Sequence, residues 1–261
     1  MSLFWLALAI KMAVTAGFVV LATATAERAG ALVGALVATL PISAGPAYVF
    51  VALDHDASFI AASALASLTV NAVTAIYALV YAAAAQTRGL ALSLAVALSA
   101  WTVLALIVRS IEWTLTAACL LNMVVIPSCV AIGRRFRNAA MPLVTRRWYD
   151  IPLRAAMAAV LVAVVVGSSA RVGPAVTGML AVFPIVLTSL MIILQPRIGG
   201  RASAAVLANT LSGLGGFFFC ILALRLAAVP LGSAGALILA LAVSVAANLL
   251  IWIARHRGIP I

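Results

Sequence analysis

Two pairs of hydrogen-bonding side chains stand in apolar stretches of the chain, one pair in each half. Asn71 and Thr74 are three residues apart, and so are Asn209 and Ser212. Residues at this spacing share one face of a helix, so each pair offers an amide or hydroxyl group to a common partner. Such pairs could bind a small polar solute; the alternative is a hydrogen bond between neighbouring helices, worth about 0.6 kcal/mol on average in membranes.

Proline interrupts two stretches that are long enough to cross a bilayer, residues 30–54 and 173–196. Pro41 and Pro184 each remove a backbone donor within such a stretch. A helix broken in hydrocarbon leaves backbone groups unpaired, which costs several kcal/mol for each group unless protein or water satisfies it. We therefore expect both breaks to lie beside protein or a polar cavity; the alternative is a simple proline kink in each stretch.

The residues that follow each proline can serve a new half-helix. Ser43 or Gly45 can cap the first one, and Thr188 and Ser189 supply hydroxyl groups after the second break. The amide groups at the start of a helix lie at its positive end and favour an anion or a carboxylate. The predicted substrate-binding residues are Lys11, Pro41, Ser43, Gly45, Asn71, Thr74, Pro184, Thr188, Ser189, Asn209 and Ser212.

Lys11 lies inside the first apolar run. A basic group at the centre of a membrane helix costs about 2.5–3.5 kcal/mol on insertion scales. Lys11 is therefore expected to face a polar interior, as the counter-charge of an anion, or to extend to the membrane surface. All five acidic residues lie at the ends of apolar runs, which disfavours an exchanger that relays protons through a carboxylate.

The sequence shows no motif that is typical of an enzyme or a metal site. It contains no HExxH or GxSxG motif, and both histidines lie at the ends of apolar runs. The three cysteines lie within apolar runs and show no CxxC spacing. We expect no catalytic activity, no cofactor and no bound metal.

The composition is that of an integral membrane protein. Hydrophobic residues make up 67% of the chain and charged residues 8%, and the mean hydropathy is +1.28, whereas ordinary globular chains carry about 25% charged residues. The excess of basic residues lies mainly at the ends of the apolar runs, which favours a role in membrane topology over binding of nucleic acid. The expected partners are the lipid bilayer and a small-molecule solute, with a homodimer possible.

The apolar runs predict an all-α protein of about nine transmembrane helices, by the length needed to cross a bilayer. Residues 133–150 form the one long polar stretch and separate a first half, 1–132, from a second half, 151–261. The expected spans are 3–24, 30–53, 57–84, 89–108, 113–132, 151–170, 173–194, 202–226 and 230–254.

Basic residues predict the orientation of these spans. With the amino terminus outside and the carboxyl terminus in the cytoplasm, all basic residues except Lys11, Arg109, Arg171 and Arg225 fall in cytoplasmic connections. The Ala- and Arg-rich composition and the short connections indicate a multi-pass protein of a bacterial inner membrane.

The two halves resemble each other when the sequence is shifted by 143 positions. This shift places Lys11 on Arg154, Gly30 on Gly173, and Pro41-Ile42 on Pro184-Ile185. Five spans, an odd number, separate the two starts, so the second copy enters from the opposite side of the bilayer. The sequence therefore predicts an inverted repeat of five plus four helices, with discontinuous helices at equivalent positions.

This plan resembles, in architecture, sodium/proton antiporters and bile-acid-type carriers, in which such repeats bind substrate near the midplane between the copies. The resemblance implies a secondary carrier of a small polar or anionic solute that works by alternating access. Two alternatives remain: a non-transporting scaffold or assembly partner in the membrane, and a lipid flippase with a lateral opening lined by basic groups.

Overall fold

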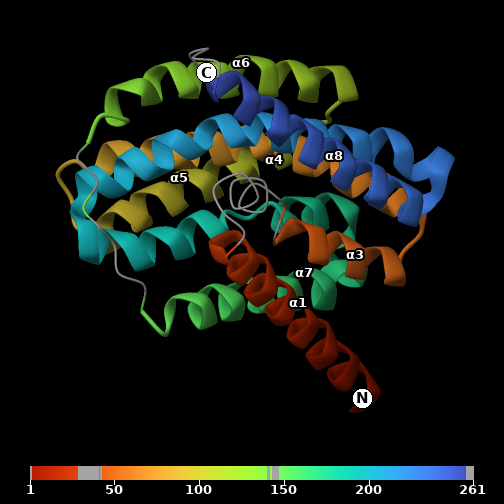
Figure 1. Ribbon diagram of the computed structural model, residues 1–261. Helices are drawn as coiled ribbons and strands as arrows, with labels where there is room; N and C mark the ends of the chain where they lie inside the picture. Colours follow the sequence, from red (N-terminus) through yellow and green to blue (C-terminus); the bar gives the residue numbers. More distant parts are fainter. Residues whose placement is uncertain (1, 29–40, 42, 140–141, 143–146, 257–261) are drawn as a thin grey trace.

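The computed structural model describes residues 2–28, 41, 43–139, 142 and 147–256, and the regular secondary structure of these residues is entirely helical (Figure 1). Six helices are long and apolar enough to cross a membrane. The structure thus confirms an all-α protein with several membrane-length helices. The helices are α1 (Ser2–Arg28), α3 (Ala44–Asp54), α4 (Ala57–Ala84), α5 (Leu90–Arg109), α6 (Leu115–Gly133), the short 3-10 helix η1 (Arg134–Phe136), α7 (Asp150–Ala181) and α8 (Ile185–His256).

Two of these helices bend sharply at glycine. The backbone leaves the helical conformation at Gly173 in α7 (φ 77°) and at Gly199 and Gly232 in α8 (φ 78° and 70°). Positive φ is the region that glycine enters without steric penalty. Pro174 follows the first bend, and prolines also precede the other two within a few residues. The expected span boundaries near 173, 202 and 230 therefore correspond to bends within α7 and α8, so nine separate helices are not seen.

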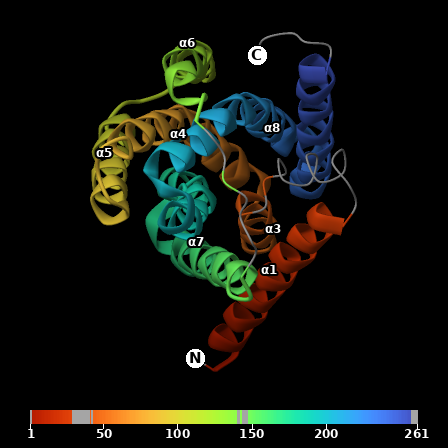
Figure 2. The same cartoon turned by 60° about the vertical axis from the view of Figure 1, so that its left-hand side comes forward.

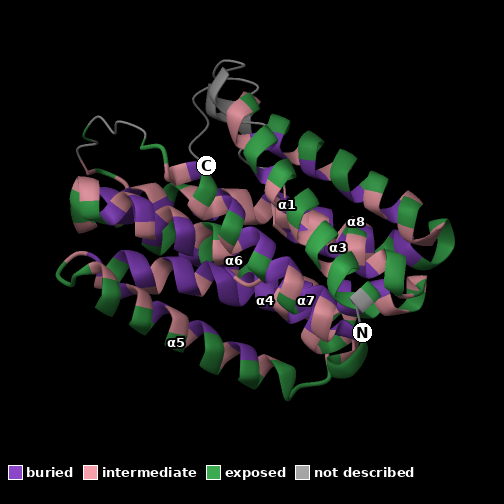
Figure 3. Cartoon of the chain, turned by 90° about the horizontal axis from the view of Figure 1, so that it is seen from below, coloured by how far each residue is buried: buried purple, intermediate pink, exposed green. Residues whose placement is uncertain are grey.

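Helix α4 lies at the centre of the protein. In Figure 2 it is surrounded by α3, α5, α6, α7 and α8, and Figure 3 shows its surface largely as buried residues. Its buried residues include the large side chains Ile60, Leu68, Tyr77 and Tyr81. The helices around α4 bury their inner faces against it and keep apolar side chains on the outer face, as expected for helices that contact lipid.

Contacts between residues far apart in the sequence show whether the segments beside α4 run parallel or antiparallel to it. Tyr77 contacts Thr188 and Tyr81 contacts Gln195, so residues 185–198 run parallel to α4. Asn71 instead contacts Leu214, which lies beyond the bend at Gly199. Because Gly200 lies beside the end of α4 at Ala85, residues 200–231 run antiparallel to it.

Helix α1 packs on the first part of α7, residues 150–172, in an antiparallel manner. Leu8 lies beside Gly167, and Val19 packs on Ala155 and Ala158 in a small apolar cluster. This cluster is separate from the main core around α4. Figures 1 and 2 both show α1 alongside this part of α7 at the margin of the molecule.

Glycine allows α7 and α8 to approach the α4 backbone closely. A side-chain carbon at Gly178 would overlap the backbone of Ser63, and one at Gly200 would overlap the carbonyl oxygen of Ala85. Small residues at a helix interface permit this kind of contact in membranes.

We expect Gly178→Ala to destabilise the protein by about 1–3 kcal/mol, since the added methyl group meets backbone and not a flexible side chain. Thermal unfolding of the detergent-purified protein measures the effect as a lower melting temperature. Gly213→Ala is the matched control, because no atom lies within 4 Å of the added carbon. Equal melting temperatures for the two variants would contradict the close contact at Gly178.

Candidate functional site

The second predicted break is present between α7 and α8. Helix α7 ends at Ala181 and α8 begins at Ile185, directly after the buried Pro184. The hydroxyl of the buried Thr188 donates to the carbonyl of Pro184 at 2.7 Å, and its backbone N–H donates to the same oxygen at 2.9 Å. Thr188 thus holds the first turn of α8 against the proline.

Side chains of α4 supply partners for carbonyl groups near this break. The hydroxyl of Ser67 donates to the carbonyl of Gly178 at 2.7 Å. The Thr74 hydroxyl lies 3.4 Å from the carbonyl of Val182 and accepts the indole N–H of Trp101 at 3.2 Å. All of these groups are buried. Helix α4 therefore provides the hydrogen-bond donors that the carbonyl groups of a broken helix need in an apolar environment.

Three further residues join α4 to α8, and the sequence analysis did not identify them. The Tyr77 hydroxyl bonds Thr188 at 2.9 Å. The Tyr81 hydroxyl donates to the side-chain carbonyl of Gln195, whose amide donates to the carbonyl of Arg88 at 3.2 Å. The signal was the spacing: both tyrosines continue, at three- and four-residue steps, the face of α4 that carries Thr74.

Asn71 faces a different part of the structure from Thr74. Its buried amide donates to Asn122 of α6 at 3.0 Å and to the carbonyl of Leu214 of α8 at 3.2 Å. Asn122 in turn donates to the carbonyl of Leu68 at 2.7 Å. Asn71 therefore joins three helices, and its own carbonyl oxygen has no partner among the described residues.

The pair in the second half lies in other surroundings. Asn209 is exposed, and its amide donates to the carbonyl of Ala205 at 2.9 Å. Ser212 is buried, with its hydroxyl 3.4 Å from the carbonyl of Asn209. Ser189 is also buried and bonds the carbonyl of Val186 within its own helix at 2.8 Å.

The first predicted break lies only partly within the described residues, because these exclude positions 29–40 and 42. Helix α3 begins at Ala44 with Ser43 at its N-cap position, and the Ser43 side chain forms no capping hydrogen bond. The backbone N–H of Gly45 donates to the carbonyl of Pro41 at 2.7 Å. Ser43 thus occupies the capping position that the sequence predicts.

Residues that follow the first predicted break and residues that precede the second meet at one residue of α4. Tyr48 of α3 bonds the Ser67 hydroxyl at 2.6 Å, and Ser67 donates to the carbonyl of Gly178 in α7. All three residues are buried or closely packed. Ser67 therefore connects the stretch after the first break to the stretch before the second.

Lys11 extends away from both breaks. Its ammonium group lies 2.6 Å from the carboxylate of Asp54 at the end of α3 and 6.0 Å from the ring of Phe50. The side chain of Lys11 is 16% exposed and that of Asp54 43%. The structure pairs Lys11 with a carboxylate of the chain itself, and its expected roles as the counter-charge of an anion or as a group that extends to the membrane surface stay predictions.

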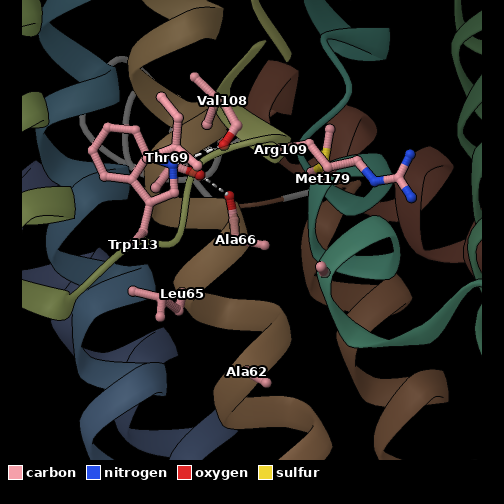
Figure 4. A pocket seen from close by; sticks show the side chains of 10 residues that line it. Ala62, Leu65, Ala66, Thr69, Val108, Arg109, Trp113 and Met179 are labelled. Carbon is pink, nitrogen blue, oxygen red and sulfur yellow. Dashed lines mark hydrogen bonds between the residues drawn. The ribbon is translucent and has the colours of Figure 1, made fainter. Parts of the chain in front are cut away.

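A cavity of about 140 Å³ lies elsewhere, between α4, the α5–α6 connection and α7 (Figure 4). Its hydrogen-bonding groups are already occupied: Thr69 donates to the carbonyl of Ala66 and Trp113 to that of Val108, each at 2.8 Å. Arg109 is exposed at its rim, and Figure 4 shows its guanidinium group extending away from Trp113. The lining residues are Ala62, Leu65, Ala66, Thr69, Val108, Arg109, Ile111, Trp113, Ala175 and Met179.

Within the described part of the chain, no group of three or more His, Cys, Asp or Glu side chains is placed to hold a metal ion. Comparison of the chain with protein-family models, curated proteins and solved structures found no match.

We expect Ser67→Ala to lower the free energy of unfolding by about 1–3 kcal/mol, because it leaves the Tyr48 hydroxyl and the Gly178 carbonyl buried without this partner. Thermal unfolding in detergent measures the loss. Ser128→Ala serves as the control, since the exposed Ser128 bonds only the carbonyl of Val124 in its own helix. A loss no larger than that of the control would rule out a structural role for Ser67.

Proposed function

We propose that this protein is a secondary carrier of a small polar or anionic solute and works by alternating access between two inverted halves. The observation that carries the proposal is the meeting of both interrupted stretches at Ser67, through Tyr48 of α3 and the carbonyl of Gly178. Carriers with inverted repeats bind their substrates where interrupted helices of the two halves approach each other.

The directions of the helices support the inverted repeat. The 143-residue shift pairs α1 with residues 150–172, and these two segments run antiparallel. A second shift, of 138 positions, superposes Asn71 on Asn209 and so pairs α4 with residues 200–231, which are also antiparallel. Parallel packing in either pair would have argued against inversion. Divided at Gly173, Gly199 and Gly232, the second half supplies four spans to the five of the first, with the amino terminus outside.

The start of α8 gives the proposed site its preference for anions. The first amide groups of a helix have no partner within that helix, and they lie at the positive end of its dipole. Thr188 and Ser189 place hydroxyl groups in this turn; both now donate to nearby carbonyl oxygens, and a bound anion would take the place of these acceptors. A carboxylate is the kind of group that such a helix start binds.

Uptake into proteoliposomes tests this proposal. The native protein, incubated with a defined mixture of small carboxylates, amino acids and sugars, should accumulate at least one anion above protein-free liposomes, as measured by mass spectrometry of the vesicle contents. Thr188→Val should reduce that uptake about tenfold or more, because a hydrogen bond to a charged group is worth about 1.5–3 kcal/mol and about 1.4 kcal/mol is a factor of ten.

Two further variants complete the uptake experiment. Ser43→Ala should reduce uptake of the same anion, since Ser43 stands at the N-cap position of α3 and its side chain makes no capping hydrogen bond that the substitution would remove. Ser128→Ala, at an exposed position of α6, should leave it unchanged. Uptake at the protein-free level for every solute would count against a carrier and leave the scaffold as the simpler account.

One observation favours the flippase as a second candidate. The cavity near the start of α4 is lined mostly by apolar side chains and has the cationic Arg109 at its rim. A lipid with apolar acyl chains and an anionic head group matches an apolar cavity that has a cation at its rim. The cavity lies near Met179, only a few residues before the break at Pro184.

Under this second candidate, fluorescent phosphatidylglycerol in proteoliposomes should exchange between leaflets, so that dithionite reduces more than the half of the fluorescence accessible from outside. Arg109→Gln should slow the exchange several-fold, since it removes the cation at the rim, whereas Arg201→Gln, an exposed position on α8, should not. Exchange no faster than in protein-free vesicles would exclude the flippase.

A further inference from the structure

Two ion pairs join α1 and α7 to the ends of the interrupted stretches. Lys11 of α1 pairs with Asp54 at the end of α3, at 2.6 Å. Near the start of α7, Asp150 accepts hydrogen bonds from both terminal nitrogens of Arg197, one of them at 2.8 Å. Each pair thus connects the first helix of one half to the far end of the interrupted stretch of the same half.

The two pairs occupy equivalent places in the two halves, with the charges exchanged. The 143-residue shift superposes Asp54 on Arg197, and it superposes Lys11 on Arg154, one helical turn from Asp150. The first half carries its cation on the first helix, whereas the second half carries its anion there. Each half therefore has an ion pair at this place, although the residues that form the pair differ between the two halves.

The pairs lie at opposite ends of the molecule. Asp54 directly precedes the start of α4 at Ala57, while Arg197 is close to Gln195, which bonds the carbonyl of Arg88 just beyond the end of α4. The 28 residues of α4 are about 42 Å long at about 1.5 Å per residue. In Figure 1 the α3–α4 connection lies at the right and the start of α7 at the left.

The helices joined by these pairs form two groups. We call α1 and residues 150–172 of α7 the arm, since they pack on each other through the cluster of Val19, Ala155 and Ala158. We call the helices packed on α4 the bundle. The arm continues into the bundle through Gly173, whose φ of 77° and open surroundings suit a hinge.

Both ends of the arm are tied to the bundle in this structure. At the end near Asp54, a second contact joins His55 of the bundle to Ser169 of the arm at 2.8 Å. At the other end, Arg197 stacks over the ring of Tyr149, 5.3 Å from its centre, while it bonds Asp150. A carrier that works by alternating access needs two such closures, and only one of them is open at a time.

We propose that the arm moves relative to the bundle and that the Lys11–Asp54 pair and the Asp150–Arg197 pair are its outer and inner latches, which release alternately. This inference rests on the proposed carrier function and adds the residues that control access from each side. It assigns Asp150 and Arg197 to the cytoplasmic closure and Lys11 and Asp54 to the external one. While one end of the arm is open, the other end must stay closed.

The test follows two buried positions of the arm in a protein whose three cysteines are replaced by alanine. Val166→Cys reports the outer end, one turn before Ser169, and Ile151→Cys reports the inner end beside Asp150; both side chains are less than a tenth exposed. A membrane-impermeant maleimide is applied to the external side for position 166 and to the cytoplasmic side, in inside-out vesicles, for position 151.

Release of one latch should have opposite effects at the two ends. Arg197→Gln should raise the labelling rate at position 151 about tenfold and lower the rate at position 166. Lys11→Gln should do the reverse. The exchange Asp150→Arg with Arg197→Asp restores the pair and should return both rates toward native values, which shows that the variants still fold.

Arg201→Gln is the matched control for charge, since Arg201 is exposed and lies four residues beyond Arg197, past the bend at Gly199, and it should change neither rate. Labelling rates at positions 151 and 166 that change with neither Arg197→Gln nor Lys11→Gln would overturn the inference. The proposed carrier function would still stand in that case if the native protein accumulates an anion. Opposite responses without accumulation of any solute would support the latches and count against the carrier.

Discussion

The structure depends on one requirement: the backbone of a helix that breaks between membrane spans must find hydrogen-bond partners without water. Helix α4 meets this requirement, because Ser67 and Thr74 lie against the carbonyls of Gly178 and Val182. The central place of α4 follows from this task, since a helix that supplies such partners must be in contact with the stretches that need them. The glycine at position 178 follows too, because only a residue without a side chain lets the backbone of α7 come this close to Ser63.

The same hydrogen bonds hold one part of the molecule to α4 by polar contacts, whereas the arm packs on the bundle mainly through apolar side chains. Tyr77, Tyr81 and Gln195 fix the start of α8 along α4, so the second break and the residues after it belong to a rigid bundle. No comparable series of hydrogen bonds joins the arm to α4 among the described residues: its polar contacts lie at its two ends, while between them Leu161, Val162, Val165 and Val166 pack into the main apolar core. A carrier needs this combination, since the binding residues must keep their geometry while the path to them changes side.

Much of the architecture could be predicted from the sequence, because apolar length, proline and charge act locally. The break at Pro184 and the position of Ser43 before α3 come from such local signals, and the span boundaries expected near 173, 202 and 230 lie within a few residues of the bends at Gly173, Gly199 and Gly232. The side-chain partners could not be predicted. Asn71 and Thr74 share the spacing of one helix face, yet Asn71 bonds α6 and α8 whereas Thr74 faces the break. Which neighbour a polar residue meets depends on packing between distant segments.

The two ends of the arm are not held equally, and this difference makes one end of the arm easier to open than the other. Lys11 makes one contact with a carboxylate that is 43% exposed, and exposed pairs of this kind contribute about 0–1 kcal/mol. Arg197 holds Asp150 through two hydrogen bonds, and both side chains are less than 15% exposed, so this pair is better shielded from solvent than the outer one. Planar guanidinium also matches a carboxylate better than an ammonium group does. The outer end therefore opens more readily from this closed arrangement, and a solute that binds in the site must supply part of the free energy that releases the inner end.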